Sequence, residues 1–182
     1  HVDVLKGVGA LSFIQKILVM PNFTPPHKGG AEGSVCQRQE MLLLGLDGLK
    51  SDLNQEGKDL EFSDLEVKRG GVSWSIDTVR EISEMTVDMD LYYVMASDSY
   101  FDFHTWKDYL SILDYVKLVV VNRGSVPEAD FKSYYADHLS SVPFERFVFL
   151  KLDTQAVSST NIRERCRMGQ SIFGLVPETV ER

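Results

Sequence analysis

Four short runs of apolar residues stand out along the chain, and between them apolar residues recur at helical spacing. The runs are rich in β-branched and aromatic side chains and lie at residues 17–20, 91–95, 118–121 and 147–150. Because they are continuously apolar and do not alternate with polar residues, they predict strands that are buried on both faces of a parallel sheet.

The intervals between these runs carry helical periodicity. The first predicted helix has apolar residues at helical spacing from Val4 to Ile14, and the second begins near Ser34. Further helical patterns cover approximately residues 76–85, 105–113, 128–138 and 160–168. Strands that alternate with helices predict βαβ crossovers, so we expect an α/β fold with a single doubly wound parallel sheet and helices on both faces.

The composition fits one domain. The chain has 182 residues, 43% of them hydrophobic, which is enough for one well-buried core, so we predict a single domain over residues 1–182. Its formal net charge of −8 argues against nonspecific binding to nucleic acid, which requires broad positive surface. A small anionic substrate remains compatible, because salt screens distant acidic residues from a few basic side chains around a pocket.

Cysteine use and hydropathy bear on where the protein works. Two cysteines, Cys36 and Cys166, are typical of a reduced cytoplasmic protein and are too few for a thiolate metal site. No stretch of about 20 apolar residues is present, and no basic start precedes an apolar segment. We therefore expect a cytoplasmic protein whose partners include neither nucleic acid nor a membrane.

The segment after the last predicted strand has the outline of a phosphate site. A predicted helix begins there with Ser159 and Thr160, and Arg163 comes one turn later. A helix start offers unpaired N–H groups and the positive end of the helix dipole, which favour an anion beyond the carboxyl end of a strand. An ordinary Ser/Thr cap with a surface arginine is the alternative.

Residues 21–30, which follow the first predicted strand, are a second candidate. Their prolines stiffen the backbone and hold His27 and Lys28 in place, and the glycines that follow supply a hinge. A lid that closes on phosphates has this composition. A plain surface loop is the alternative.

Three more candidates come after the middle strands. Asp98 follows the run that ends at Met95 and suits ribose hydroxyls, and Trp106 suits stacking on a flat heterocycle. A helix N-cap for Asp98 and a core position for Trp106 are the alternatives. Arg123 places a cation at the end of the next strand.

We interpret residues 67–78 as the exit of a strand, a glycine turn at Gly70 and Gly71, and the start of a helix. The unpaired backbone N–H groups of that helix start can receive a carboxylate.

In this order and spacing, the segments resemble the bacterial nicotinate mononucleotide adenylyltransferases of the HxGH nucleotidyltransferase superfamily, from His1 to about Pro177. The pattern Ser-Ser-Thr-x-x-Arg at residues 158–163 is shared with the wider superfamily. The patterns that resemble the nicotinate branch are Pro-Pro-His-Lys at 25–28, Lys-Arg-Gly-Gly-x-Ser-Trp-Ser-x-Asp-Thr at 68–78, and Asp98 followed by Trp106.

The resemblance implies that the AMP part of ATP is transferred to the 5′-phosphate of nicotinate mononucleotide, which gives nicotinate adenine dinucleotide and pyrophosphate. The residues that it assigns to ATP are His27 and Lys28, which close over the phosphates, Asp98, which binds a ribose, and Ser159, Thr160 and Arg163, which hold the phosphates. Mg²⁺ is expected to travel on the ATP oxygens and to need little from the protein.

For the acceptor, the resemblance implies that Trp106 stacks on the pyridine ring and that Arg123 approaches the mononucleotide phosphate. It also implies that the backbone amides of Ser75 and Lys107 receive the nicotinate carboxylate. A related adenylyltransferase or cytidylyltransferase with another phosphate acceptor is an alternative, as is a noncatalytic nucleotide-binding protein. The oligomeric state stays open, and a homo-oligomer is compatible with the sequence.

His1 resembles the second histidine of the His-x-Gly-His signature, because the interval from His1 to His27 fits the corresponding interval in the family. By this analogy His1 acts with Arg163 as a catalytic residue that stabilises charge on the transferred and leaving phosphates. A residue left from a tag is the alternative. We expect roughly 15 to 20 further N-terminal residues, which would hold the first strand and the glycine-rich turn that this sequence lacks.

Overall fold

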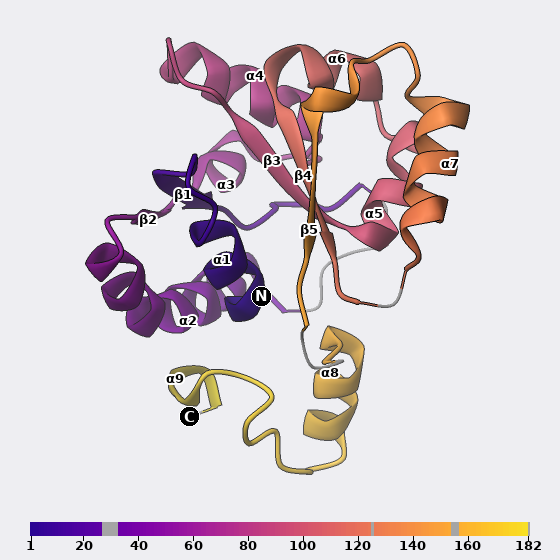
Figure 1. The fold of residues 1–182 in the computed structure, drawn as a ribbon. Coiled ribbons are helices and arrows are strands. Elements are labelled where there is room, and N and C mark those ends of the chain that lie inside the picture. The colour runs from indigo at the N-terminus through magenta and orange to yellow at the C-terminus, as the bar shows by residue number, and fades with distance from the viewer. Residues whose placement is uncertain (27–32, 125, 154–156, 182) are drawn as a thin grey trace. The chain divides into compact units, whose positions relative to one another are not determined.

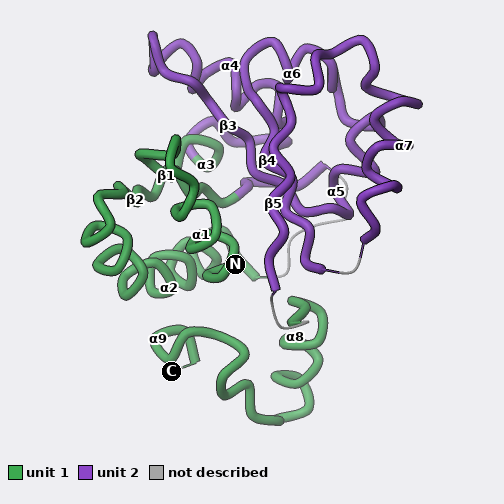
Figure 2. The backbone as a smooth tube through the Cα atoms, viewed as in Figure 1, with its two compact units in different colours: residues 1–21, 31–67, 154–182 green, residues 22–30, 68–153 purple. Residues whose placement is uncertain are grey.

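The computed structural model describes residues 1–26, 33–124, 126–153 and 157–181 (Figure 1). Helices alternate with parallel strands along the chain. The chain divides into two compact units, the first with residues 1–21, 31–67 and 154–182 and the second with residues 22–30 and 68–153 (Figure 2).

The first unit contains a parallel pair of strands. Its elements in chain order are α1 (Val2–Gly9), β1 (Lys16–Val19), α2 (Val35–Gln55), β2 (Asp59–Phe62), α8 (Ser159–Arg167) and α9 (Glu178–Glu181). Ile17 lies opposite Leu60 in the register of the pair, and both side chains are buried. α3 (Leu65–Arg69) spans the boundary between the units in the sequence.

A capping box starts α2. Ser34 Oγ accepts a hydrogen bond from Gln37 N–H at 3.2 Å, and Gln37 Oε1 accepts one from Ser34 N–H at 2.9 Å, so two helix-start donors are satisfied. Leu49 and Leu53, one helical turn apart, are buried. Gly9 allows α1 to approach this face, because a Cβ at Gly9 would lie 2.7 Å from Leu53 Cδ2.

The second unit contains a parallel sheet with the strand order β3-β4-β5. Its elements are α4 (Ser75–Met85), β3 (Tyr92–Ala96), α5 (Ser97–Phe101), the 3-10 helix η1 (Phe103–Thr105), α6 (Tyr109–Tyr115), β4 (Lys117–Asn122), α7 (Glu128–His138), the 3-10 helix η2 (Phe144–Arg146) and β5 (Phe147–Lys151). The side chains from Leu118 to Val121 are fully buried, so the central strand β4 is covered on both faces as predicted.

Aromatic side chains fill the core of the second unit. The fully buried ring of Tyr100 in α5 packs against Phe131 and Tyr134 of α7 and against Phe147 and Phe149 of β5. α5 and α7 lie on the same side of the sheet in Figure 1. Burial raises the pKa of the Tyr100 hydroxyl well above its usual value.

The predicted α/β fold, with parallel strands and flanking helices, is confirmed, and the predicted runs correspond to β1, β3, β4 and β5. The described strands are hydrogen-bonded in two sheets rather than in a single one, because no described strand bridges β1 and β2 to the β3–β5 sheet.

Four local features differ from the prediction. β2 was missed because its sequence Asp-Leu-Glu-Phe is short and alternates polar with apolar residues. Residues 67–69, interpreted as the exit of a strand, belong to helix α3. The first helix ends at Gly9 instead of Ile14, and the helix predicted at 105–113 is divided between η1 and α6, since Asp108 takes a left-handed conformation with φ 51°.

Candidate active site

Tyr93 of β3 connects two of the residues that the sequence assigns to the acceptor. Its hydroxyl shares a hydrogen bond of 3.1 Å with Ser75 Oγ, and its ring meets Trp106 edge to face at a centroid distance of 5.9 Å. Ser75 is the first residue of α4, so the helix supplies no acceptor for its N–H group. The three side chains are half-buried in the second unit.

Lys107 lies at the rim of this group. Its Nζ is 3.8 Å from Asp77 Oδ2 in the first turn of α4 and 5.5 Å from the centroid of the Trp74 ring. The ion pair and the cation–π contact connect the residue after Trp106 to the start of α4. The structure therefore brings Ser75, Trp106 and Lys107 together. We call these three residues and Tyr93 the acceptor pocket, a name that refers only to the role predicted from the sequence.

The chain between the glycine turn and α4 is hydrogen-bonded to the residues that precede the predicted lid. Gly70 and Gly71 both have positive φ, 68° and 71°, which favours glycine at each position. Directly after them, the buried Ser73 accepts a hydrogen bond from Phe23 N–H at 2.9 Å through its Oγ and donates one from its N–H to Thr24 O at 2.9 Å. Residues 22–24 are therefore tied to the turn before α4.

The lid residues His27 and Lys28 lie outside the described residues. Their predicted roles stay predictions.

Asp98 and Arg123 follow neighbouring strands at the same edge of the sheet. Ala96 pairs in register with Val121, and each candidate comes two residues after its strand partner. Both side chains are exposed. Asp98 lies inside the first turn of α5 and accepts a hydrogen bond from Ser99 N–H at 2.9 Å. Ala96 is the N-cap residue of this helix, so Asp98 is not an N-cap.

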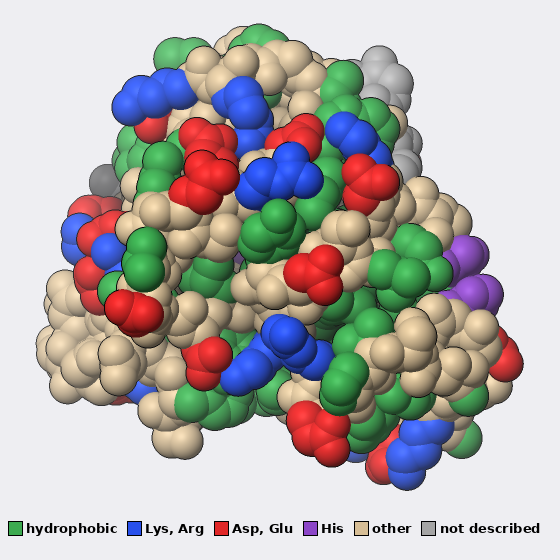
Figure 3. Space-filling view, turned by 90° about the horizontal axis from the view of Figure 1, so that it is seen from above, with side chains coloured by type: hydrophobic (Ala, Val, Ile, Leu, Met, Phe, Trp, Pro, Cys, Tyr) green, Lys and Arg blue, Asp and Glu red, His purple; other side chains and the backbone are tan. Residues whose placement is uncertain are grey.

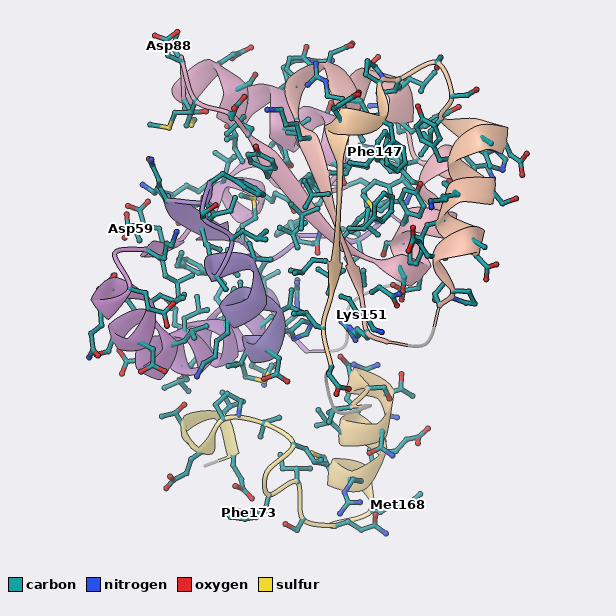
Figure 4. The ribbon with its side chains drawn as sticks, viewed as in Figure 1. Asp59, Asp88, Phe147, Lys151, Met168 and Phe173 are labelled. Atoms are coloured by element: carbon teal, nitrogen blue, oxygen red, sulfur yellow. The ribbon has the colours of Figure 1, made fainter. Side chains whose placement is uncertain are left out.

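Asn122 organises the turn that carries Arg123. Its Nδ2 donates a hydrogen bond to Val126 O at 2.8 Å, and its Oδ1 accepts one from Gly124 N–H at 3.2 Å. Asn122 pairs in register with Lys151. Lys151 lies at the carboxyl end of β5, and Phe147 lies at the other end of the same strand (Figure 4). Arg123 therefore lies at the carboxyl end of the sheet, in a turn that the side-chain hydrogen bonds of Asn122 stabilise.

The start of α8 carries the residues assigned to the ATP phosphates. Ser158 is the N-cap, since its Oγ accepts a hydrogen bond from Asn161 N–H at 3.1 Å. Ser159 and Thr160 therefore do not cap the helix, and they occupy its exposed first two positions. Arg163 Nη2 lies 3.4 Å from Thr160 Oγ1, so the cation and the hydroxyl share one face of the helix start.

His1 directly precedes α1 as its N-cap residue. Its carbonyl oxygen accepts a hydrogen bond from Leu5 N–H at 3.0 Å, and the residue is exposed. His1 and the α8 residues belong to the first unit, and the acceptor-pocket residues belong to the second.

Sequence reasoning missed Tyr93, Asp77 and Asn122 as organising residues. Tyr93 was counted only as part of an apolar run, although a polar tip in a buried strand next to a predicted site is a usable signal. Asp77 stands in a block that the resemblance already singled out, and a carboxylate in the first turn of a helix is a common partner for a lysine nearby.

On the face seen in Figure 3, basic side chains are interspersed with acidic ones. Within the described ranges, no group of three or more His, Cys, Asp or Glu side chains is placed to hold a metal ion. None of the described helices has the length and apolar character to cross a membrane.

Parallel strands with polar side chains after their carboxyl ends are typical of nucleotide-binding α/β proteins. Residues 1–165 match the family model described as Cytidylyltransferase-like. The chain therefore belongs to the cytidylyltransferase-like family.

Relatives in this family carry a more specific name. The chain is 33% identical over 171 residues to the probable nicotinate-nucleotide adenylyltransferase of Dictyoglomus turgidum, a match that covers 92% of this chain and 77% of the relative. It is 30% identical over 168 residues to the protein of the same name from Dictyoglomus thermophilum, with coverage of 92% and 80%.

Two solved structures have a similar fold. The Plasmodium falciparum nicotinic acid mononucleotide adenylyltransferase complexed with NaAD matches with a TM-score of 0.72 and 16% identity, covering 93% of this chain and 78% of that one. The same enzyme complexed with APC matches with a TM-score of 0.68 and 14% identity, covering 93% and 77%. At these identities the likeness concerns the fold.

Proposed function

We propose that the protein transfers the adenylyl group of ATP to nicotinate mononucleotide, which forms nicotinate adenine dinucleotide in NAD biosynthesis. The observation that carries the proposal is the acceptor pocket, where Tyr93 contacts both Ser75 at the start of α4 and the half-buried Trp106 ring, and Lys107 pairs with Asp77 of α4. The names of the curated relatives point to the same reaction.

The pocket suits a flat ring that bears a carboxylate. The Trp106 indole offers a face for stacking on the pyridine ring. The N–H groups of Ser75 and Lys107 donate to the carboxylate, and the start of α4 adds its positive dipole. A carboxylate accepts from both donors, whereas the NH₂ group of an amide would turn a donor toward a donor. The pocket therefore favours the acid over the amide.

In the reaction, an oxygen of the mononucleotide phosphate attacks the α-phosphorus of ATP. The bond from that phosphorus to the oxygen bridging to the β-phosphate breaks, and pyrophosphate leaves. Such a transfer requires alignment and stabilisation of charge, without a covalent enzyme intermediate. The groups that we assign to these tasks are Arg123 on the acceptor phosphate, Asp98 on a ribose, and Ser159, Thr160, Arg163, His1, His27 and Lys28 on the ATP phosphates.

Mg²⁺ is the expected cofactor, bound to the ATP phosphate oxygens. It keeps several waters and adds positive charge there, so a small set of protein cations is sufficient for the rest. From the low cysteine content, the net charge of −8 and the apolar pattern of the sequence, we place the enzyme in the cytoplasm, with neither nucleic acid nor a membrane as a partner. One chain supplies all the acceptor groups that we assign, and a homo-oligomer stays compatible with them.

Pyrophosphate release by the product of the complete reading frame tests the proposal. We expect rapid release from ATP and Mg²⁺ with nicotinate mononucleotide and much slower release with nicotinamide mononucleotide. Preference for the amide would keep the chemistry and overturn our account of the carboxylate site. Release with neither acceptor would overturn the proposed reaction.

A further inference from the structure

An ion pair and a hydrogen bond connect the residues of the acceptor pocket to α4, and the two interactions differ in strength. The Lys107–Asp77 pair spans 3.8 Å, and its side chains are 45% and 36% exposed. Ion pairs of that kind contribute little to stability, because water and salt screen them. The hydrogen bond between Tyr93 and Ser75 is shorter, at 3.1 Å, and is partly buried, so it is the stronger of the two constraints.

Tyr93 contacts two parts of the acceptor pocket from a single strand. It comes from the rigid strand β3, whose neighbour β4 is fully buried from Leu118 to Val121. From there it contacts the first residue of α4 through its hydroxyl and the Trp106 ring through its own ring. One side chain thus sets the distance between the N–H donor at Ser75 and the stacking surface.

We propose that Tyr93 is a positioning residue of the acceptor pocket, which fixes the start of α4 relative to the Trp106 ring and so selects a pyridine ring with a carboxylate at the matching separation. The inference rests on the proposed function for its substrate. The hydroxyl of Tyr93 acts through Ser75 and the ring through Trp106, and neither touches the reacting phosphates.

Tyr93→Phe tests the hydroxyl alone, because the ring and its contact with Trp106 remain. The matched control is Tyr92→Phe, which removes one hydroxyl from the adjacent residue of β3, whose ring lies 5.4 Å from Lys117 Nζ. We expect Tyr93→Phe to raise the KM for nicotinate mononucleotide about three- to ten-fold, the range set by one hydrogen bond. The KM for ATP and kcat should stay within about two-fold.

A double-mutant cycle with Ser75→Ala separates this connection from general packing. Ser75→Ala keeps the backbone N–H that faces the carboxylate and removes only the partner of the Tyr93 hydroxyl. If the two hydroxyls act together, the double variant has the same KM for the mononucleotide as either single variant. Multiplied effects on KM, or equal effects of Tyr93→Phe and Tyr92→Phe, would overturn the inference.

A readout without substrate keeps this inference separate from the proposed function. The chain has two tryptophans, Trp74 and Trp106, so ¹⁹F spectra of protein labelled with 5-fluorotryptophan contain two signals that Trp74→Phe assigns. We expect Tyr93→Phe to shift and broaden the Trp106 signal, and Tyr92→Phe to leave it in place. An inactive wild-type protein would overturn the proposed reaction only, and an unchanged Trp106 signal would overturn the positioning role of Tyr93.

Discussion

Arg163 is the cation of the α8 helix start, and it lies beside Thr160 on the surface of the helix. Arg163→Ala should lower turnover about 100- to 1,000-fold, because the loss of one group that stabilises developing charge has an effect of that size. The melting temperature should change little, since no α8 residue is buried. Steady-state pyrophosphate release and a thermal melt measure the two effects.

Arg165 of the same helix is the matched control for Arg163. Its Nε donates a hydrogen bond to Ser171 O at 2.8 Å, at the opposite end of α8. Arg165→Ala should keep nearly wild-type turnover. Wild-type rates in Arg163→Ala, or equal losses in both variants, would remove Arg163 from the proposed mechanism.

Trp106 tests the stacking surface of the pocket. Trp106→Ala should raise the KM for nicotinate mononucleotide about ten-fold or more, as loss of stacking on one ring does, and should raise the KM for ATP much less. Trp106→Phe, which retains an aromatic face, should recover part of the loss. Equal changes for both substrates would show that Trp106 serves the core, where its ring also contacts Phe103.

At the residue scale, sequence reasoning succeeded where side-chain chemistry is unusual for its place in the chain. The adjacent hydroxyls at Ser159 and Thr160 and the cation at Arg163 are conspicuous without any structure. Tyr93 is not conspicuous, because its contacts with Ser75 and Trp106 join residues 18 and 13 positions away in the sequence. Only the packing of α4 and η1 beside β3 reveals its role.

At the level of elements, α8 and α2 both begin with a serine cap, but they differ in whether any of their residues are buried. α2 buries Leu49 and Leu53, whereas α8 has no buried residue. Ser158→Ala should therefore reduce turnover by loosening the start of α8, with little change in the melting temperature. Ser34→Ala should instead lower the free energy of unfolding by about 1 kcal/mol.

Circular-dichroism melts and pyrophosphate release on both cap variants check this contrast. A large fall in melting temperature for Ser158→Ala, with unchanged turnover, would contradict the assignment of α8 to the phosphates.

The strand predictions depended on how apolar each strand is, and β4 and β2 are the two extremes. β4 is apolar from Leu118 to Val121 and is fully buried, so its pattern is unambiguous. β2 has the burial pattern of a strand with one buried side chain, Leu60, and carries two acidic residues. Its place in a sheet depends on pairing with β1, a nonlocal contact that the sequence of β2 does not encode.

At the scale of the whole molecule, the buried Tyr100 predicts how stability changes with pH. Burial holds its pKa above the value of the unfolded chain, which is about 10. The folded state therefore keeps a proton that the unfolded state loses. The contribution of Tyr100 to the free energy of unfolding is constant below about pH 10 and falls as the pH rises beyond it. Denaturant titrations across this range should show the fall.

Tyr100→Phe should flatten this alkaline decline, because the ring stays in the core without an ionisable group. Tyr92→Phe, which leaves Tyr100 in place, should keep the wild-type slope. An alkaline decline that is the same in Tyr100→Phe as in the wild type would contradict the role assigned to this burial.

The acceptor-pocket residues come from three separate segments of the second unit, and the α8 residues come from the first. The sequence located the segments of Ser75, Trp106 and α8, whereas the role of Tyr93 and the contacts within the pocket required the folded chain. The pairing of Lys107 with Asp77 across 30 residues is one such contact.

The identity of the product is the most direct test of the account. The protein would be incubated with ATP, Mg²⁺ and nicotinate mononucleotide, and the products would be identified by mass spectrometry. The account predicts nicotinate adenine dinucleotide and pyrophosphate in equal amounts. Formation of ADP and phosphate, or of no dinucleotide at all, would contradict it.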